Sequence, residues 1–344
     1  MYLRNPYAPQ STGRRPGRTI VPVTANEPPD RVLAAYGLAG APRTPLDGGQ
    51  AWAVRAEPPV VLKRRRLPGS GAGAEWEAEL RQLAAELGWP AGRVVRTVDG
   101  AAAVTGATGG ETWTCETWLP GERREVRSVA GWRIVGRLLG RLHSDFARSD
   151  PGVQRPGLGK AWELDVLTEA TGVGTFNRLV AAFGHAYPEL AASIRRERYR
   201  NLRELARLGY PDLPEQPIHG GFSPGHLLWT GGELTGVIGW EFARRDAAMC
   251  DLAPLLMPRG PLELPFAQAL FEGYATVRPV SNQEFGLLPA LVRASLLWEV
   301  TVLLIGWRLG GGDPDRVVHT MEERFPAFER YALELGMLRA NVRG

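Results

Sequence analysis

Lysine and cysteine are scarce in this chain, and long apolar runs are missing. Lys63 and Lys160 are the only lysines among 344 residues, so the net charge of +4 comes almost entirely from arginine. The two cysteines are too few for a disulfide framework and fit a reduced, cytoplasmic setting. The apolar stretch 294–307 is too short to cross a bilayer and contains Glu299, so we predict a buried helix there and no membrane partner.

The basic residues do not indicate a nucleic-acid partner. The runs 64–66 and 195–198 lack the interleaved aromatic residues and the zinc-ligand spacing of common nucleic-acid modules, so we expect solvated faces. Residues 1–25 are rich in Pro, Gly and Arg and have no apolar core, which predicts a flexible tail rather than a signal peptide. Abundant Ala, Gly, Pro and Arg with little Lys indicates a GC-rich genome.

Two parts of different character follow the tail. Residues 26–118 combine predicted helices at 29–36 and 75–87 with several short predicted strands. The predicted strands are 51–56, 60–63, 93–98, 102–105 and 112–118. After a Leu-Pro-Gly hinge, residues 119–344 read as long helices, such as 129–146 and 188–208, with one β-rich hairpin at 217–240. The patterns alone predict a two-lobed α+β protein.

A resemblance to a known family lies in the hairpin region. The segment PIHGGFSPGHLL at 217–228 resembles the catalytic loop H-G-D-x-x-x-x-N of the aminoglycoside phosphotransferase and choline kinase families. The segment GVIGWEF at 236–242 resembles their I-D-W/F-E motif. The separations of five and thirteen residues between the motif positions 221, 226 and 239 are those of the family.

The resemblance extends from about residue 30 to the C-terminus. Arg141-Leu142-His143, Asp246 and Asp251 match further family positions, where the two aspartates are expected to be structural. It implies a bilobal protein-kinase-like α+β fold, with a small mixed N-lobe containing an antiparallel sheet and a larger helical C-lobe.

The resemblance also implies a nucleotide site. In the family, a lysine that ends the third strand neutralises the nucleotide phosphates, and a helix carboxylate holds that lysine. Lys63 and Glu77 stand in these places, with Glu79 as the alternative carboxylate. Gly48 and Gly49 form a turn whose backbone N–H groups would cover the phosphates, although a plain hairpin turn explains the pair equally well.

Three positions that carry the chemistry depart from the family pattern. Gly221 replaces the aspartate that accepts the substrate proton, His226 replaces a metal-binding asparagine, and Gly239 replaces the main magnesium-binding aspartate. Glycine offers no ligand, and magnesium prefers hard oxygen ligands to an imidazole nitrogen. Loss of a general base costs about 10²–10⁴-fold in rate. We therefore expect no magnesium site and a pseudokinase-like protein.

Other residues could compensate. Glu241 is a substitute metal ligand in one interpretation and a carboxylate that anchors the lower lobe in the other. His219 is expected to be a hydrogen-bonded structural residue.

The hypothesis that follows is a cytoplasmic accessory protein without ordinary kinase activity. It would bind ATP or another nucleotide, a small molecule or a peptide, and could serve a partner enzyme in an actinobacterial biosynthetic pathway. The alternative is an active or weak phosphotransferase with relocated carboxylates, or an enzyme with another reaction in an enlarged cleft.

Overall fold

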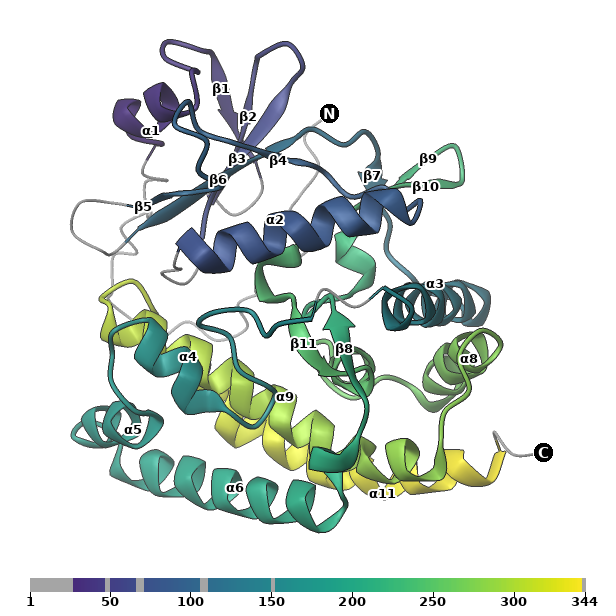
Figure 1. The fold of residues 1–344 in the computed structure, drawn as a ribbon. Helices are drawn as coiled ribbons and strands as arrows, with labels where there is room; N and C mark the ends of the chain where they lie inside the picture. Colours follow the sequence, from purple (N-terminus) through teal and green to yellow (C-terminus); the bar gives the residue numbers. More distant parts are fainter. Residues whose placement is uncertain (1–26, 47–49, 66–70, 106–110, 150–151, 342–344) are drawn as a thin grey trace, which may run out of the picture.

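The computed structural model describes residues 27–46, 50–65, 71–105, 111–149 and 152–341. A twisted sheet and one long helix form a small N-terminal part, and a mostly helical part lies below it (Figure 1). This arrangement confirms the predicted α+β kinase-like fold. The predicted tail at 1–25 lies outside the described residues.

The N-terminal sheet is antiparallel throughout and has the order β1-β2-β3-β6-β4, with β5 also on β6. Its strands are β1 (Arg43–Pro45), β2 (Ala51–Val54), β3 (Val60–Arg64), β4 (Val94–Val95), β5 (Val104–Thr105) and β6 (Thr112–Thr117). The predicted strands all appear, but several are shorter than the sequence pattern indicated.

The two faces of this sheet differ because side chains alternate along each strand. One face carries Trp52, Leu62 and Trp113, which pack with helix α1 (Asp30–Ala35) in a small core. The centroids of the Trp52 and Trp113 rings are 5.4 Å apart. The other face carries Lys63 and Glu116, so the side of the sheet turned toward the next helix is charged.

That helix, α2 (Gly71–Glu86), begins four residues before the predicted start at residue 75. Its apolar residues Trp76, Leu80 and Ala84 belong to the same core cluster as the helical part of the protein. Its buried charged residues, Glu77 and Arg81, bind partners on the sheet. Helix α2 therefore separates an ionic layer from the main apolar core.

Two small sheets follow residue 119, and one of them contacts the N-terminal part. Strand β7 (Glu122–Arg123) pairs with the hairpin of β9 (Leu227–Thr230) and β10 (Glu233–Val237), and β8 (Glu215–Ile218) pairs with β11 (Arg244–Ala247). The Val237 amide donates to the Pro90 carbonyl at 2.8 Å, which ties the predicted hairpin to the N-terminal part.

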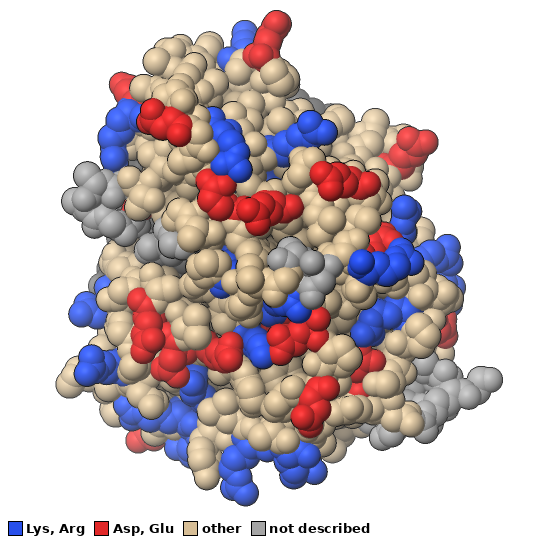
Figure 2. All heavy atoms as spheres, viewed as in Figure 1, with Lys and Arg blue, Asp and Glu red and all other residues tan. Residues whose placement is uncertain are grey.

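The remaining elements form the helical part. They are α3 (Val129–Ala147), α4 (Leu164–Ala170), α5 (Phe176–Gly184), α6 (Pro188–Arg207), η2 (Tyr210–Asp212), η3 (Pro224–His226), η4 (Trp240–Phe242), α7 (Met249–Leu252), η5 (Ala253–Leu256), α8 (Leu264–Ala275), α9 (Asn282–Arg308), α10 (Pro314–His319), η6 (Thr320–Arg324) and α11 (Phe325–Asn341). On the face in Figure 2, basic and acidic side chains are interspersed over these elements.

Helix α9 contains the apolar stretch 294–307. It is long and apolar enough to span a membrane, but 67% of its most apolar window is buried inside the protein. Among the described residues it is the one helix that meets this test, and its burial is typical of a core helix.

Candidate functional site

The loop after β8 carries the first motif, and buried hydrogen bonds hold it in place. The backbone amides of His219 and Gly220 donate to the two carboxylate oxygens of Asp251, each at 2.7 Å. Gly220 has φ +75°, and a Cβ there would overlap the Phe242 carbonyl. Only glycine fits this turn.

Asp251 also joins this loop to helix α3. His143 lies 3.2 Å from Asp251 through Nε2 and 2.8 Å from the Tyr274 hydroxyl through Nδ1. Burial opposes the charge of Asp251, but the hydrogen bond and charge of His143 lower its pKa below the ordinary value. The structure thus brings together the separate motif segments at 141–143, 219–220 and 251.

The second expected structural aspartate, Asp246, is fully buried on β11. It accepts hydrogen bonds from the Ala161 and Ala247 amides, both at 2.8 Å, and from the Tyr210 hydroxyl. The Arg244 guanidinium is 3.0 Å from Asp246 Oδ2. Because both carboxylate oxygens are engaged, Asp246 acts as a structural anchor.

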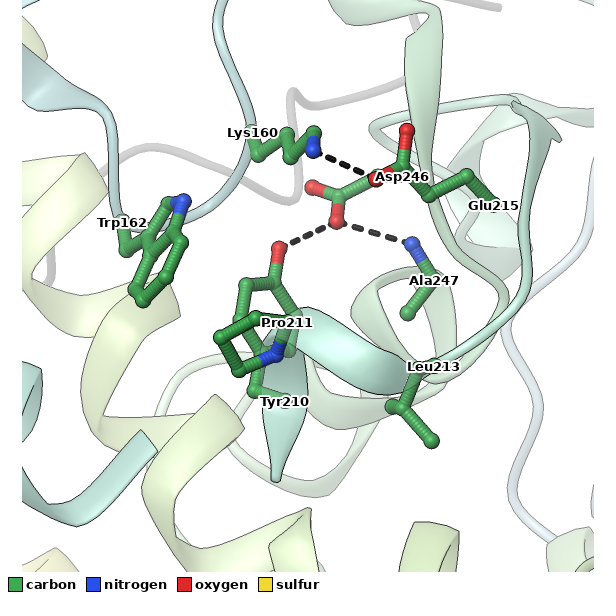
Figure 3. A pocket seen from close by; sticks show the side chains of 8 residues that line it. All are labelled: Lys160, Trp162, Tyr210, Pro211, Leu213, Glu215, Asp246 and Ala247. Carbon is green, nitrogen blue, oxygen red and sulfur yellow. Dashed lines mark hydrogen bonds and ion pairs between the residues drawn. The ribbon is translucent and has the colours of Figure 1, made fainter. Parts of the chain in front are cut away.

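A small pocket lies beside Asp246, at the start of β8, with Lys160 paired to Glu215 at its edge (Figure 3). It is lined by Lys160, Trp162, Tyr210, Pro211, Leu213, Glu215, Asp246 and Ala247. None of the motif residues from 217 to 242 lines it. The motif loop follows the opposite end of β8, so this pocket is separate from the candidate site.

His226 fills the space beside Gly239. A Cβ built on Gly239 would lie 2.8 Å from three atoms of the His226 ring, Cδ2, Cε1 and Nε2. Gly239 also has φ +85°, a conformation that strains other residues. The enlarged cleft expected in the alternative hypothesis is therefore not found at Gly239, because the imidazole of His226 occupies that space.

The tautomer of His226 follows from its contacts. Its Nδ1 lies 2.6 Å from the Gly221 carbonyl, which can only accept, so Nδ1 carries the proton in the neutral ring. The Ser223 hydroxyl lies 3.3 Å from the same nitrogen. Burial lowers the pKa of His226 despite the hydrogen bond to Gly221 and the charge of Glu241. His226 is thus a neutral, packed side chain.

These residues do not fit a magnesium ion. Gly221 and Gly239 have no side-chain donor, and a magnesium site requires several oxygen ligands. His226 offers one nitrogen and lies over Gly239. Among the described residues, no three His, Cys, Asp or Glu side chains are grouped so as to hold a metal. We therefore assign no reaction step to a metal here.

Lys63 lies at the predicted position, on β3, but its carboxylate partner is not the predicted one. Lys63 forms an ion pair with Glu116 of β6, whereas the predicted partner was Glu77. In the register of β3 and β6, Val61 lies opposite Glu116 and Lys63 opposite Thr114, so Lys63 and Glu116 are diagonal neighbours on one face. The sheet itself therefore holds the lysine.

Glu77 binds arginines instead. Its Oε2 lies 2.8 Å from Arg65 and 3.0 Å from Arg155, and its Oε1 lies 3.4 Å from Arg81. Burial alone would raise the pKa of Glu77, but the charges of Arg65 and Arg155 lower it to about 2. Arg81 also lies 2.5 Å from Glu116, which links the two carboxylates.

Arg155 joins this network to the second motif. Its Nη1 donates to the carbonyls of Glu241 at 3.0 Å and Ala243 at 2.9 Å, while Nη2 donates to Glu77. Burial lowers the pKa of Arg155 to about 10, against the charge of Glu77. The Glu241 carboxylate acts on Arg65, Arg155 and His226 by its charge, so it lies near the arginines.

Sequence reasoning missed four of these residues as members of the site, Arg65, Arg81, Arg155 and Glu116. Arg65 follows the last residue of β3, two positions after Lys63, which was a usable signal for one of them. The expected solvated face at 64–66 is wrong for Arg65, because its side chain is only 11% exposed and binds Glu77. Gly48 and Gly49, predicted to cover the phosphates, lie outside the described residues.

Comparisons with known proteins agree with the motifs. The profile of a family described as "Phosphotransferase enzyme family" matches residues 46–282. A homoserine kinase of Polaromonas naphthalenivorans is 30% identical over 206 residues, which are 55% of this chain and 60% of that protein. The chain thus aligns with less than two thirds of this relative's length.

Two solved structures have a similar fold. An aminoglycoside phosphotransferase of Alicyclobacillus acidocaldarius has a TM-score of 0.57 at 18% identity, covering 92% of this chain and 96% of that one. An amicoumacin kinase in complex with AMP-PNP and Ca²⁺ has a TM-score of 0.60 at 14% identity, covering 82% and 87%. At such identities the likeness establishes the fold alone.

Proposed function

The chain belongs to the phosphotransferase enzyme family, and we propose that its interlobe cleft binds a nucleotide through protein cations rather than through magnesium. In this proposal the protein acts as a nucleotide-, small-molecule- or peptide-binding accessory protein without ordinary kinase activity.

The charge of the ionic layer between the sheet and helix α2 carries the proposal. Four cations, Lys63, Arg65, Arg81 and Arg155, form ion pairs there with two carboxylates, Glu77 and Glu116. The charge of a third carboxylate, Glu241, also acts on Arg65 and Arg155, so one positive charge remains in excess. An excess of partly buried positive charge is costly unless an anion balances it. A polyphosphate supplies that charge, and guanidinium groups bind phosphate oxygens strongly.

Lys63 is the cation best placed to meet a ligand, because its side chain is 28% exposed while those of Arg65 and Arg155 are nearly buried. The pair with Glu116 orients it, and its position at the end of β3 is the one that the family uses for nucleotide phosphates.

Calorimetric titration of ATP in EDTA tests this proposal. We expect measurable binding to the wild type and at least a tenfold loss in Lys63→Met, since a charge-assisted contact contributes about 1.5–3 kcal/mol. Lys160→Met is the matched control, because its side chain is also 28% exposed and also paired with a carboxylate. Equal affinity in all three proteins, or no binding to any, would reject the proposal.

A second candidate is an active phosphotransferase, which the family match and the homoserine kinase relative favour. Glu241 is then the residue proposed to replace a missing carboxylate, near Arg65 and Arg155. Transfer of labelled γ-phosphate from ATP to homoserine by the wild type, with loss of transfer in Glu241→Gln, would establish this candidate. Absence of transfer would leave the binding proposal in place.

A further inference from the structure

Helix α6 separates its charges by sign. Within residues 195–207, its two acidic side chains, Glu197 and Glu204, are partly buried and pair with Arg293 of α9. Every exposed charged side chain in the same range is an arginine. Helix α6 lies along the lower edge of the view in Figure 1, and basic side chains project from that edge in Figure 2. We call these exposed residues the arginine face: Arg195, Arg196, Arg200, Arg203 and Arg207.

Most of the arginine face has no acidic partner within the protein. Arg200 pairs with Glu329 of α11, where the two side chains are 52% and 39% exposed. The other four arginines of the face form no ion pair with any described residue. The helix dipole accounts for Arg207, which lies in the last turn, but not for the arginines in the middle of the helix.

The arginine face is unfavourable for the isolated protein. Side chains four residues apart are neighbours on a helix, so Arg196 and Arg200 repel each other, as do Arg203 and Arg207. A solvated helix avoids this repulsion when acidic residues alternate with basic ones on its surface. In α6 the acidic residues instead face Arg293, so only an external anion would relieve the repulsion.

An exposed aromatic ring lies within the arginine face. Tyr199 is 64% exposed, and the guanidinium of Arg203 lies 5.7 Å from the centroid of its ring. Tyrosine and arginine are among the residue types that contribute most binding energy at protein–protein interfaces. Guanidinium groups also bind carboxylates through two parallel hydrogen bonds. This composition favours an acidic protein as the partner.

Carboxylates border the arginine face on both sides. Asp165 of α4 lies 2.6 Å from Arg198 on one side, and Glu329 of α11 lies 3.2 Å from Arg200 on the other. The face is therefore about one helix wide, roughly 10 Å, and about 18 Å long at 1.5 Å per residue. A nucleic-acid duplex is wider and would bring phosphates against these carboxylates, whereas a single acidic peptide segment fits between them.

We propose that the arginine face of α6 docks an acidic segment of a partner protein, with carboxylates opposite Arg195, Arg196 and Arg203. The inference goes beyond the proposed function, because no residue of the arginine face belongs to the interlobe cleft. A partner bound there leaves the nucleotide site accessible.

Fluorescence anisotropy with the full chain tests the proposal. The probe is a labelled model peptide of about 16 residues that carries glutamate at every third or fourth position, which aligns the carboxylates on one helix face. We expect saturable binding to the wild type and about a tenfold loss of affinity in the triple variant Arg195→Gln/Arg196→Gln/Arg203→Gln, since each exposed ion pair contributes modestly.

The matched control removes the same charge elsewhere. Arg31→Gln/Arg55→Gln/Arg137→Gln changes three exposed arginines on α1, after β2 and on α3. Its affinity for the peptide should stay within about twofold of the wild type, because exposed charges more than a Debye length away are screened. Equal losses in the two triple variants, or no binding of the peptide to the wild type, would overturn the proposal.

Two other occupants of the arginine face give different results. Single-stranded DNA with the same number of charges should bind more weakly than the peptide, and tighter binding that the α6 variant loses would overturn the choice of a protein partner. Light scattering should show no dimer of the wild type that dissociates in the α6 variant. Such a dimer would mean that a second copy of the chain covers the face, and would overturn the proposal as well.

Thermal unfolding separates docking from a structural role. Without a partner, the α6 triple variant should melt no lower than the wild type, because the substitutions remove repulsion between like charges. A lower melting temperature of that variant than of the control variant would show that these arginines stabilise the fold, which contradicts the proposal. Neither measurement involves ATP or Lys63, so failure of nucleotide binding and failure of docking are distinguishable.

Discussion

Replacement of Glu77 by glutamine tests the ionic layer between the sheet and helix α2. The variant keeps the shape of the side chain but removes the charge that Arg65 and Arg155 share. The fall in the pKa of Glu77 from 4.5 to about 2 corresponds to about 3 kcal/mol of stabilisation, at about 1.4 kcal/mol per pH unit. Removing one partner of a buried ion pair has a cost of the same order, about 3–5 kcal/mol.

Urea unfolding at pH 7 should therefore show Glu77→Gln to be less stable than the wild type by about 3 kcal/mol. The lowered pKa means that this contribution is complete above pH 4.5 and is lost as the pH falls from 4.5 toward 2. The difference between the two proteins should therefore shrink over that interval.

Glu75→Gln is the matched control on the same helix, because Glu75 pairs with Arg96 where their side chains are 39% and 50% exposed. Such surface pairs contribute about 0–1 kcal/mol. If Glu77→Gln cost no more than Glu75→Gln, the reasoning about the ionic layer would be refuted.

Three further predictions concern the motif segments. Arg155→Met should speed amide hydrogen exchange at 240–245 and in α2, because it removes the donors to Glu241, Ala243 and Glu77. Arg148→Met, which removes a side chain that is 72% exposed, should not. Equal exchange in both variants would contradict the proposed link through Arg155. Gly239→Asp should lower the melting temperature more than Gly221→Asp, because the Cβ at 239 meets the His226 ring. Adding His226→Asn to Gly239→Asp should restore part of the lost melting temperature. Equal melting temperatures of the two aspartate variants would argue against the packing of His226 on Gly239. Because the pKa of His219 is about 4 in the folded protein and 6.5 otherwise, the unfolded state binds more protons between these values. The free energy of unfolding should then decrease as the pH falls from 6.5 to 4, by up to about 3 kcal/mol, and urea titrations of His219→Gln should show a smaller decrease.

The sequence was sufficient for the features that depend on short-range pattern. The β9–β10 hairpin inside the predicted segment 217–240, the spacing of the motifs and the lysine on β3 are local, and each could be predicted from residue order. The start of that segment, β8, instead pairs with β11, which the prediction of one hairpin lacked. The predicted start of α2 at residue 75 is wrong by four residues. Gly71 and Gly73 disfavour a helix locally, but packing of Trp76 and Leu80 on the main core stabilises it.

The long-range contacts could not be predicted in the same way. The pairing of Lys63 with Glu116 depends on the register of β3 and β6, which residue order does not specify. Arg155 lies 78 residues from Glu77 in the chain and has no motif of its own. His226 packs over Gly239, so these two departures from the family pattern depend on each other. In the sequence they appear as two unrelated losses of metal ligands.

Restoring the family residues therefore requires a coordinated change. A Cβ at 221 makes only ordinary contacts, but a Cβ at 239 lies 2.8 Å from the His226 ring, so that ring must move or be replaced first.

The dependence of ATP affinity on divalent ions tests the central proposal most directly. Calorimetry would compare the dissociation constant of ATP in EDTA with that in magnesium for the wild-type protein. Our account predicts the same constant within about twofold, because the charge is supplied by lysine and arginine. Binding that is tenfold or more tighter with magnesium would contradict it, and would indicate that Glu241 or another carboxylate holds the ion.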